Sequence, residues 1–219
     1  MIIAAHNEAD RIGASLAGLA DVFPGARMIV ADDASTDSTV QVAEAAGAEV
    51  VRAPRNLGKG GNATLAADLL LAGDPGDTDM VLLADADLGT SADQLRGLVE
   101  AVEEGRGDLA VAVFARRVGG GFGLALGAAR KVIHAKTGLE TVAPISGQRA
   151  MRVEVLKKVV PFAHGFGMET AMTIDAHRAG YRLVEVELDL EHRATGRTAA
   201  GFAHRARQLA DILRVWFRR

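Results

Sequence analysis

Short apolar runs alternate along the chain with polar or glycine-rich turns and with segments of helical period. The apolar runs of strand length predict strands over residues 1–5, 28–31, 48–52, 80–84, 109–115, 145–152 and 181–190. The segments of helical period predict helices over residues 35–46, 60–72, 91–104, 123–136, 166–179 and 199–219. Because strands alternate with helices, we expect an α/β fold with a mostly parallel sheet and crossover helices.

Three polar clusters follow predicted strands, at the points where the chain leaves the sheet. They are His6-Asn7-Glu8, Asp32-Asp33 and Asp85-Ala86-Asp87. Ligands of parallel sheets bind outside the carboxyl ends of the strands. We therefore expect these distant clusters to meet at one edge of the sheet and to form a ligand site there.

Composition narrows the class of protein. A chain of 219 residues, 49% apolar and 24% charged, suits one globular domain with a sizeable core. A net charge of −3 gives no reason to expect a nucleic acid as partner. The lack of cysteine excludes disulfides and thiolate chemistry and fits a cytoplasmic setting. No run approaches the roughly 18 apolar residues of a membrane span, and we expect no signal peptide.

The pair Asp85 and Asp87 is the first candidate site. Two carboxylates two residues apart, just past a buried strand, face the same crevice if the turn is tight. Hard oxygen ligands suit Mg²⁺ or Mn²⁺, and such an ion neutralises the charge of a leaving diphosphate. The alternative is that both aspartates cap the turn and the next helix.

Two further segments suit a nucleotide. Short acidic and hydroxyl side chains over residues 32–37 accept hydrogen bonds from a base or a ribose, although part of this segment also caps a helix. In Asn-Leu-Gly-Lys-Gly-Gly, residues 56–61, the glycines let the backbone approach a ligand and Lys59 offers a charge to a phosphate. The spacing matches neither a Walker A loop nor G-x-G-x-x-G, and a plain loop before a helix is the alternative.

Together these segments resemble the ordered motif set of family 2 glycosyltransferases with the GT-A fold. The resemblance is carried by Ala4-Ala5-His6-Asn7-Glu8-Ala9, Asp32-Asp33-Ala34-Ser35-Thr36-Asp37-Ser38-Thr39, Asn56-Leu57-Gly58-Lys59-Gly60 and Asp85-Ala86-Asp87-Leu88. It extends from residue 1 to about residue 197 and is strongest for dolichyl-phosphate-mannose-synthase-like members, with some features of glucosyl-3-phosphoglycerate synthases. It implies a three-layer α/β/α domain.

The resemblance also implies roles for particular residues. The nucleotide-sugar site would comprise Ala4, Ala5, Glu8, Asp32, Asp33, Lys59, Asp85 and Ala86. Within it, Asp32 or Asp33 would contact the base or ribose, and Lys59 would lie near the diphosphate. Asp87 would be catalytic by holding the metal, and Asp85 would touch the ribose or sugar. As one of the paired carboxylates, Asp85 is also a candidate metal ligand.

The chain departs from the family pattern at two places. Alanine stands at Ala5 where the family usually has proline, and the glutamine that assists the metal in many polyprenol-type members is missing near Gly89. This leaves room for another metal ligand, for which His192 is the candidate, because related enzymes use a late histidine. Arg193 and Arg197 would clamp a phosphate. A surface histidine and two solvated arginines are the alternatives.

The acceptor side is predicted from two segments. Glu169 resembles the acidic residue that faces the acceptor, and as a catalytic base it would take a proton from an attacking hydroxyl. A phosphate acceptor would need no base, and Glu169 would then position the substrate. Its alternative role is that of a carboxylate favoured by a helix N-terminus. Residues 146–149, with Arg149 as a phosphate contact, are expected in the acceptor loop.

The last segment predicts a basic amphipathic helix. Aromatic and aliphatic residues recur at helical spacing and arginines surround them. We expect a domain over residues 1–198 and a helix over residues 199–219. The helix either belongs to the same domain or docks on an anionic membrane, which would suit a lipid-phosphate acceptor.

The resulting hypothesis is a metal-dependent glycosyltransferase. It would move a hexose from a UDP- or GDP-sugar to an unknown acceptor, such as a polyprenyl phosphate or a small phosphorylated molecule. Inversion is implied by the resemblance, but the similarity to retaining synthases leaves the stereochemistry open. A sugar-phosphate nucleotidyltransferase and a non-catalytic nucleotide-binding or membrane-docked interaction protein are the alternatives. Peripheral contact with the inner membrane face and a homodimer stay open.

Overall fold

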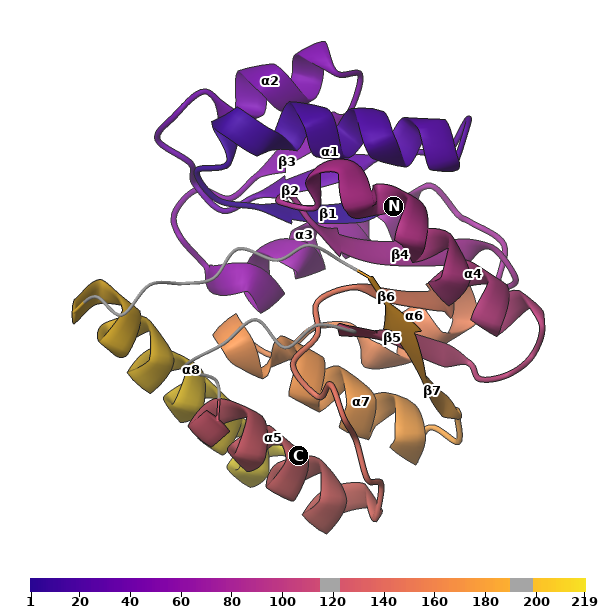
Figure 1. Cartoon of the computed structure of the whole chain (residues 1–219), viewed down its shortest axis with the longest axis vertical. Coiled ribbons are helices and arrows are strands. Elements are labelled where there is room, and N and C mark those ends of the chain that lie inside the picture. Colours follow the sequence, from indigo (N-terminus) through magenta and orange to yellow (C-terminus); the bar gives the residue numbers. More distant parts are fainter. Residues whose placement is uncertain (115–122, 190–198) are drawn as a thin grey trace.

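A seven-stranded sheet runs through the molecule and carries helices on both faces (Figure 1). The computed structural model describes residues 1–114, 123–189 and 199–219, with the backbone alone at residue 90 and residues 199–207. The strands are β1 (Ile2–Ala5), β2 (Ile29–Asp32), β3 (Glu49–Arg52), β4 (Met80–Asp85), β5 (Leu109–Phe114), β6 (Arg149–Arg152) and β7 (Leu183–Leu188). Their order is β3-β2-β1-β4-β6-β5-β7, and neighbours pair in parallel except at β6, which is antiparallel to β4 and β5.

Helices form a layer on each face of this sheet. One layer holds α1 (Ala9–Val22), α2 (Thr39–Ala45), the 3₁₀ helix η1 (Gly89–Leu95) and α4 (Arg96–Glu103). The other holds α3 (Gly58–Ala72), α6 (Val153–Val159) and α7 (Met168–Arg178), which follows the short 3₁₀ helix η2 (Gly165–Gly167). Outside α7 lie α5 (Gly123–Thr137) and α8 (Ala199–Arg218). The α/β/α layers and the mostly parallel sheet confirm the fold predicted from the sequence.

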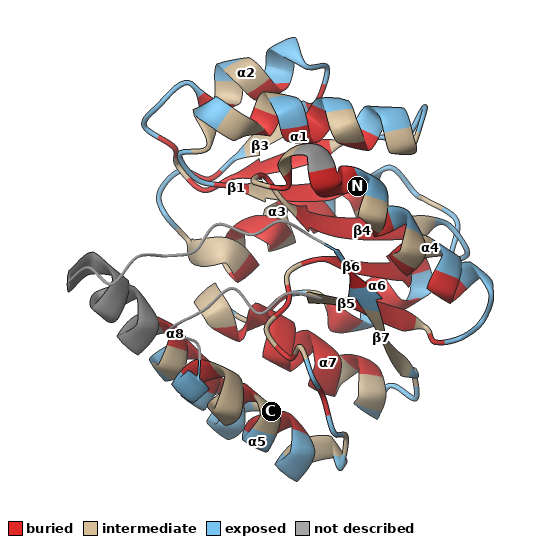
Figure 2. Cartoon of the chain, viewed as in Figure 1, coloured by how far each residue is buried: buried red, intermediate tan, exposed pale blue. Residues whose placement is uncertain are grey.

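The central strands are buried on both faces. In β1, Ile3 packs into the core beneath α1, and Ile2 packs into the core beneath α3, with exposed fractions of 0% and 2%. The buried residues in Figure 2 accordingly follow the strands and the inner sides of the helices. Strands with two covered faces have no room for functional polar groups along their length, so such groups collect at the strand ends.

Helix α1 was not predicted, and its start shows the reason. The N-cap residue Glu8 makes no side-chain capping hydrogen bond, and the Ala9 N–H donates instead to the carboxylate of Asp37 at 3.2 Å. The cap therefore comes from a loop 28 residues away, which no local pattern reveals. Gly18 further weakens the local helix signal, although a Cβ there would lie 3.1 Å from Ala92 Cβ, so the glycine serves close packing.

Other predicted boundaries also change. The strand expected over residues 145–152 covers only β6, because the preceding residues form a loop, and helix α6 was not predicted. The helix expected over residues 91–104 starts as η1 and continues as α4. The Ser91 hydroxyl donates to the Leu88 carbonyl at 2.8 Å in the first turn of η1, so it does not cap the helix.

Helix α8 packs on the rest of the domain through one side. Ile212 and Val215 are 0% and 3% exposed in a cluster with α5 and α7, whereas Trp216 and Phe217 are 41% and 85% exposed. In the described ranges, no helix is both long and apolar enough to cross a membrane. The amphipathic character predicted for this helix thus corresponds to a packed side and an open side.

Candidate active site

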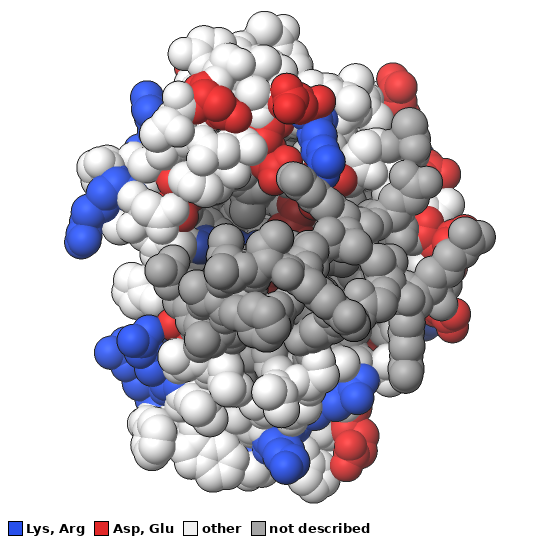
Figure 3. Space-filling view, turned by 60° about the vertical axis from the view of Figure 1, so that its left-hand side comes forward, with Lys and Arg blue, Asp and Glu red and all other residues white. Residues whose placement is uncertain are grey.

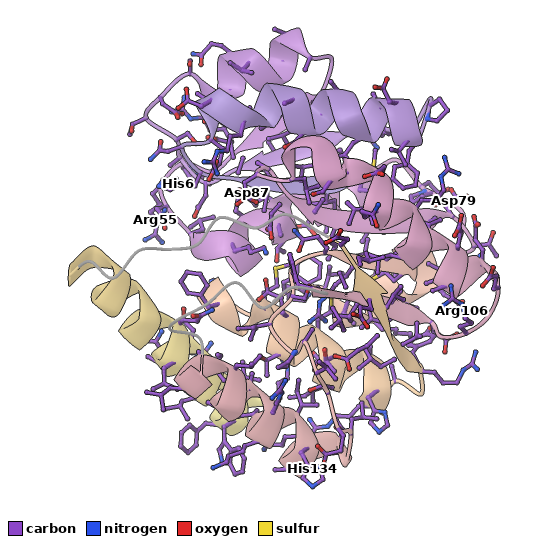
Figure 4. The ribbon with its side chains drawn as sticks, in the orientation of Figure 1. His6, Arg55, Asp79, Asp87, Arg106 and His134 are labelled. Carbon is purple, nitrogen blue, oxygen red and sulfur yellow. The ribbon has the colours of Figure 1, made fainter. Side chains whose placement is uncertain are left out.

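The carboxyl ends of β1, β2 and β4 lie side by side at one edge of the sheet, because β1 pairs in parallel with both neighbours. The turns after these strands are therefore adjacent, as the order of elements predicted. His6 and Asp87 lie toward this edge, whereas Asp79 and Arg106 lie toward the opposite one (Figure 4). A space-filling view shows a hollow beside the grey residues, with acidic and basic side chains inside it (Figure 3).

The turn after β1 is tied to the turn after β2. Asn7 has a left-handed backbone with φ of 56°, and its N–H donates to Ser35 Oγ at 2.9 Å. The Glu8 N–H donates to Thr39 Oγ1 at 2.9 Å. These bonds fix both turns relative to each other. They also hold Glu8, which the resemblance places in the nucleotide-sugar site, at this edge of the sheet.

Asp32 and Asp33 have different surroundings. Both Asp33 oxygens accept backbone N–H groups of the next loop, from Leu57 at 2.6 Å and from Gly58 at 2.9 Å. Asp32 is 0% exposed, and its Oδ2 lies 3.5 Å from Arg52 Nε. Its Oδ1 is buried and has no hydrogen-bond partner in the described part of the chain. Of the two, Asp32 therefore has the oxygen without a protein partner, and this oxygen is enclosed by the turn.

The Asp85-Ala86-Asp87 turn is held in place by a buried side chain of α1. Residues alternate there as in a strand, so Ala86 points into the core and the two half-buried aspartates share the outer side. Ser15 of α1 is fully buried, and its hydroxyl donates to the Ala86 carbonyl at 2.8 Å and accepts the Gly89 N–H at 3.0 Å. One hydroxyl of α1 thereby fixes both sides of the turn.

Lys59 joins two carboxylates from different parts of the chain. Its Nζ lies 2.6 Å from Asp85 Oδ1 and 3.0 Å from Glu169 Oε1, and the side chain of Glu169 is 6% exposed. Gln148 Nε2 donates to the second oxygen of Asp85 at 3.1 Å. A side chain on Gly147 would overlap with this ion pair. Burial alone would lower the pKa of Lys59, but the charges of Asp85 and Glu169 outweigh it and raise the pKa.

The glycines around Lys59 pack against protein. Gly58 has φ of 73°, and a Cβ there would lie 3.1 Å from Gly165 Cα. A Cβ on Gly60 would overlap with the Ala163 carbonyl. In this structure the glycine-rich segment brings the start of α3 against the loop before Glu169, which differs from the expected approach to a ligand.

Comparison with protein families identifies the family to which this edge of the sheet belongs. The model of glycosyl transferase family 2 matches residues 1–160, which include the three clustered turns and Lys59. The chain belongs to glycosyl transferase family 2. It is a glycosyltransferase that uses a nucleotide-sugar donor, as the resemblance of its motifs implied.

Individual relatives agree with the family. An undecaprenyl-phosphate mannosyltransferase from Micrococcus luteus is 31% identical over 211 residues, which cover 89% of this chain and 84% of the relative. Glucosyl-3-phosphoglycerate synthase from Mycobacterium tuberculosis, solved with Mn²⁺, UDP and glucosyl-3-phosphoglycerate, matches with a TM-score of 0.74 and 28% identity over 98% of this chain and 78% of that chain. The same synthase with Mg²⁺ and UDP gives a TM-score of 0.75 and 28% identity over 98% and 77%. Both groups named in the resemblance are thus found.

Arg149 has surroundings that were not expected for a phosphate contact. It is 1% exposed, and its guanidinium donates to the carbonyls of Ser146 and Pro144 and to the hydroxyl of Thr173. Burial lowers its pKa to about 10, against the opposing charges of Glu169 and Glu185. Its donors face the protein and brace the loop before β6. A direct phosphate contact stays a prediction that these bonds do not favour.

The remaining predicted residues divide into two groups. His192, Arg193 and Arg197 lie outside the described residues. Ala4 and Ala5 end β1 at the shared edge, and the Ala86 N–H donates to the Ala4 carbonyl at 3.1 Å. Ser15 and Gln148 were missed as supports of Asp85 and Asp87. Ser15 lies in no motif, and Gln148 lies in the segment expected in the acceptor loop rather than at Asp85, so only the fold shows that both support this turn.

The carboxylates at this edge fit part of a divalent metal site. Asp87 is half-buried and makes no hydrogen bond or ion pair within the described residues, so its oxygens are available. Both oxygens of Asp85 have protein partners, Lys59 and Gln148. The described ranges contain no group of three acidic, histidine or cysteine side chains that could hold an ion. Further ligands would have to come from a donor diphosphate or from outside these ranges.

Proposed function

We propose that this glycosyltransferase transfers a hexose from a UDP- or GDP-sugar to a phosphorylated acceptor, and that the reaction depends on Mg²⁺ or Mn²⁺. The proposal is carried by Lys59, whose single ammonium group contacts both Asp85 and Glu169 at the carboxyl edge of the sheet. Lys59 and Asp85, which are expected at the donor, are thereby joined to Glu169, which is expected at the acceptor. Asp87 lies on the same turn as Asp85 and can serve a cation.

The donor would be held by groups at this edge of the sheet. Both oxygens of Asp33 already accept backbone N–H groups, whereas Asp32 Oδ1 has no protein partner and would accept an N–H of the base once the turn opens to admit it. Asp87, with Asp85, holds the divalent ion. When bound, that ion offsets the negative charge of the departing nucleoside diphosphate. Lys59 offers a second positive charge near the same phosphates.

A phosphorylated acceptor is supported by the relatives. The Micrococcus luteus protein is named for undecaprenyl phosphate, and the Mycobacterium tuberculosis synthase was solved with phosphoglyceric acid. An acceptor oxygen attacks the anomeric carbon as the bond to the diphosphate breaks. If that oxygen belongs to a phosphate, no proton need be removed and Glu169 positions Lys59. If it belongs to a hydroxyl, Glu169 is the group that takes the proton.

A lipid acceptor would also require contact with a membrane. We propose that the protein works on the cytoplasmic side and meets the bilayer through the open side of α8. Leu213, Trp216 and Phe217 are 47%, 41% and 85% exposed there, and Arg214 and Arg218 lie on the same helix. Exposed aromatic side chains beside arginines suit an anionic lipid surface.

The proposal is tested by donor turnover. Purified protein is incubated with UDP-glucose, GDP-mannose and related donors, with Mn²⁺ or with EDTA, and nucleoside diphosphate release is followed with undecaprenyl phosphate or 3-phosphoglycerate as acceptor. We expect one donor to be consumed in a metal-dependent reaction that one of the acceptors accelerates. Asp87→Asn should lower the rate about 100-fold, because it removes charge from the metal site.

Asp93→Asn is the matched control. Asp93 is an exposed acid in η1, close in sequence to Asp87, and its loss should leave the rate unchanged. Acceleration by only one acceptor decides between the lipid and the small molecule. Metal-independent nucleotide binding without turnover of any donor would contradict the proposal and favour a non-catalytic nucleotide-binding protein.

A further inference from the structure

The turn that leads into Glu169 is held from behind by the C-terminal helix. Asp211 of α8 is 7% exposed, and its Oδ2 accepts the Phe166 N–H at 3.2 Å. Its Oδ1 pairs with Arg214 in the next turn of the helix. Phe166 lies in η2, which continues directly into α7, and Glu169 is in the first turn of α7. A carboxylate of α8 thus fixes the backbone three residues before Glu169.

Two glycines allow close contact on both sides of this turn. Gly165 has φ of 59°, and a side chain on it would overlap with the Asp211 carboxylate. On the other side of the turn, a Cβ on Gly58 would lie 3.1 Å from Gly165 Cα. The segments therefore form one stack of α8, the turn and the start of α3. Glu169 lies at the end of this turn and Lys59 in the first turn of α3.

Apolar packing supports the turn only in part. A cavity of about 230 Å³ lies between residues 161–164 and the end of α8, and Asp211, Val215 and Arg218 are among its lining residues. Where a loop borders a cavity, few side-chain contacts oppose its displacement. The close packing of Gly167 against Val215 holds the other end of the turn, so the Asp211 carboxylate is the polar restraint on the end that faces the cavity.

We infer that Asp211 is a positioning residue for glycosyl transfer, acting through the Phe166 N–H on Glu169 and, through Glu169, on Lys59. The kinetic part of this inference rests on the proposed function, because a displaced Glu169 slows turnover only if this edge is the active site. Without the carboxylate, the first turn of α7 is free to shift against α3. A shift of about 1 Å at a reacting group can lower a rate by up to about 100-fold.

The test compares Asp211→Ala with Asp211→Asn. Asparagine keeps an oxygen that can accept the Phe166 N–H, whereas alanine keeps none. We expect Asp211→Ala to lower kcat about tenfold or more with little change in donor KM, and Asp211→Asn to restore most of kcat. Amide hydrogen exchange of the peptide spanning residues 164–170 should become about tenfold faster in Asp211→Ala and stay close to wild type in Asp211→Asn.

Asp175→Ala is the matched control for a purely structural effect. Asp175 of α7 pairs with Arg219 at 2.9 Å, so its loss weakens contacts between α7 and the end of the chain without touching the turn. It should lower the melting temperature but leave kcat and the exchange of residues 164–170 unchanged. An equal loss of kcat in Asp175→Ala, wild-type exchange in Asp211→Ala, or no rescue by asparagine in a folded protein would overturn the inference. If wild type turns over no donor, the proposed function fails, while the exchange result still decides whether Asp211 fixes the turn.

Discussion

At the scale of single residues, Lys59 places one positive charge between two carboxylates. The ammonium group competes for Asp85 with any cation that Asp85 would bind. Because the pKa of Lys59 is raised, its ammonium contributes fully to these ion pairs from neutral pH up to pH 10.5, the ordinary lysine value. This contribution is lost only as the pH rises through the raised value. Lys59 is therefore a charged competitor throughout the neutral range.

This competition leads to a prediction about metal binding. Lys59→Met should bind Mn²⁺ alone several-fold more tightly, because the competing charge is gone, and should bind the donor more weakly, because the diphosphate loses a cationic partner. Calorimetric titration with Mn²⁺ and with the donor checks both results, and the difference in Mn²⁺ affinity should be equal at pH 7 and pH 9. Lys157→Met, which removes an exposed pair with Asp77, is the control and should change neither. An unaltered Mn²⁺ affinity in Lys59→Met would mean that Asp85 does not bind the metal.

Gly147 gives a second prediction at this scale. A methyl group at this position would overlap with Lys59 Nζ and lie 2.6 Å from Asp85 Oδ2, and both atoms are ends of side chains that can move aside. Gly147→Ala should therefore keep its melting temperature within a few degrees while donor turnover falls about tenfold or more. Gly127→Ala, with open space around its Cβ, is the control. Full activity of Gly147→Ala would show that the ion pair is dispensable.

At the scale of elements, the strands and their functional ends could be predicted because their signals are local. Apolar runs such as residues 80–84 stop at a polar turn, and a parallel sheet brings such turns together. Glu169 and Lys59 were assigned to acceptor and donor separately. Their contact depends on how α3 packs against the loop before α7, which no spacing in the sequence encodes.

The elements that were missed depend on distant partners. Helix α1 receives its cap from Asp37, and Ser15 of that helix has a role only because the fold places it beneath Ala86. Arg149 was expected at a phosphate as part of the acceptor loop. Its position at the start of β6, between β4 and β5, buries it instead. The burial of Arg149 follows from the order of the strands in the sheet. The alternation of strands and helices along the sequence does not reveal that order.

At the scale of the whole molecule, α8 belongs to two environments. Its inner side supports the active-site turn through Asp211 and packs through Ile212 and Val215. On its open side, Lys136 of α5 lies over the Trp216 ring, with Nζ 5.4 Å from the centroid. The same helix thus joins the turn before Glu169 to the side for which we propose contact with a membrane.

The open side can be tested without disturbing the packed one. Trp216→Ser with Phe217→Ser should lower association with liposomes that contain anionic lipid about tenfold or more, because it removes exposed aromatic surface that would enter the interface. The melting temperature should fall little, since Phe217 is 85% exposed and Trp216 41% exposed.

Ile212→Ser is the control for a loss of packing. It disrupts a fully buried position and should lower the melting temperature, while the folded fraction keeps its affinity for lipid. Co-sedimentation with vesicles at low and high salt separates apolar insertion from attraction by the arginines, which salt screens. If the double variant binds vesicles as wild type does, α8 serves the packing of the domain alone, and a lipid acceptor would have to reach Glu169 by another route.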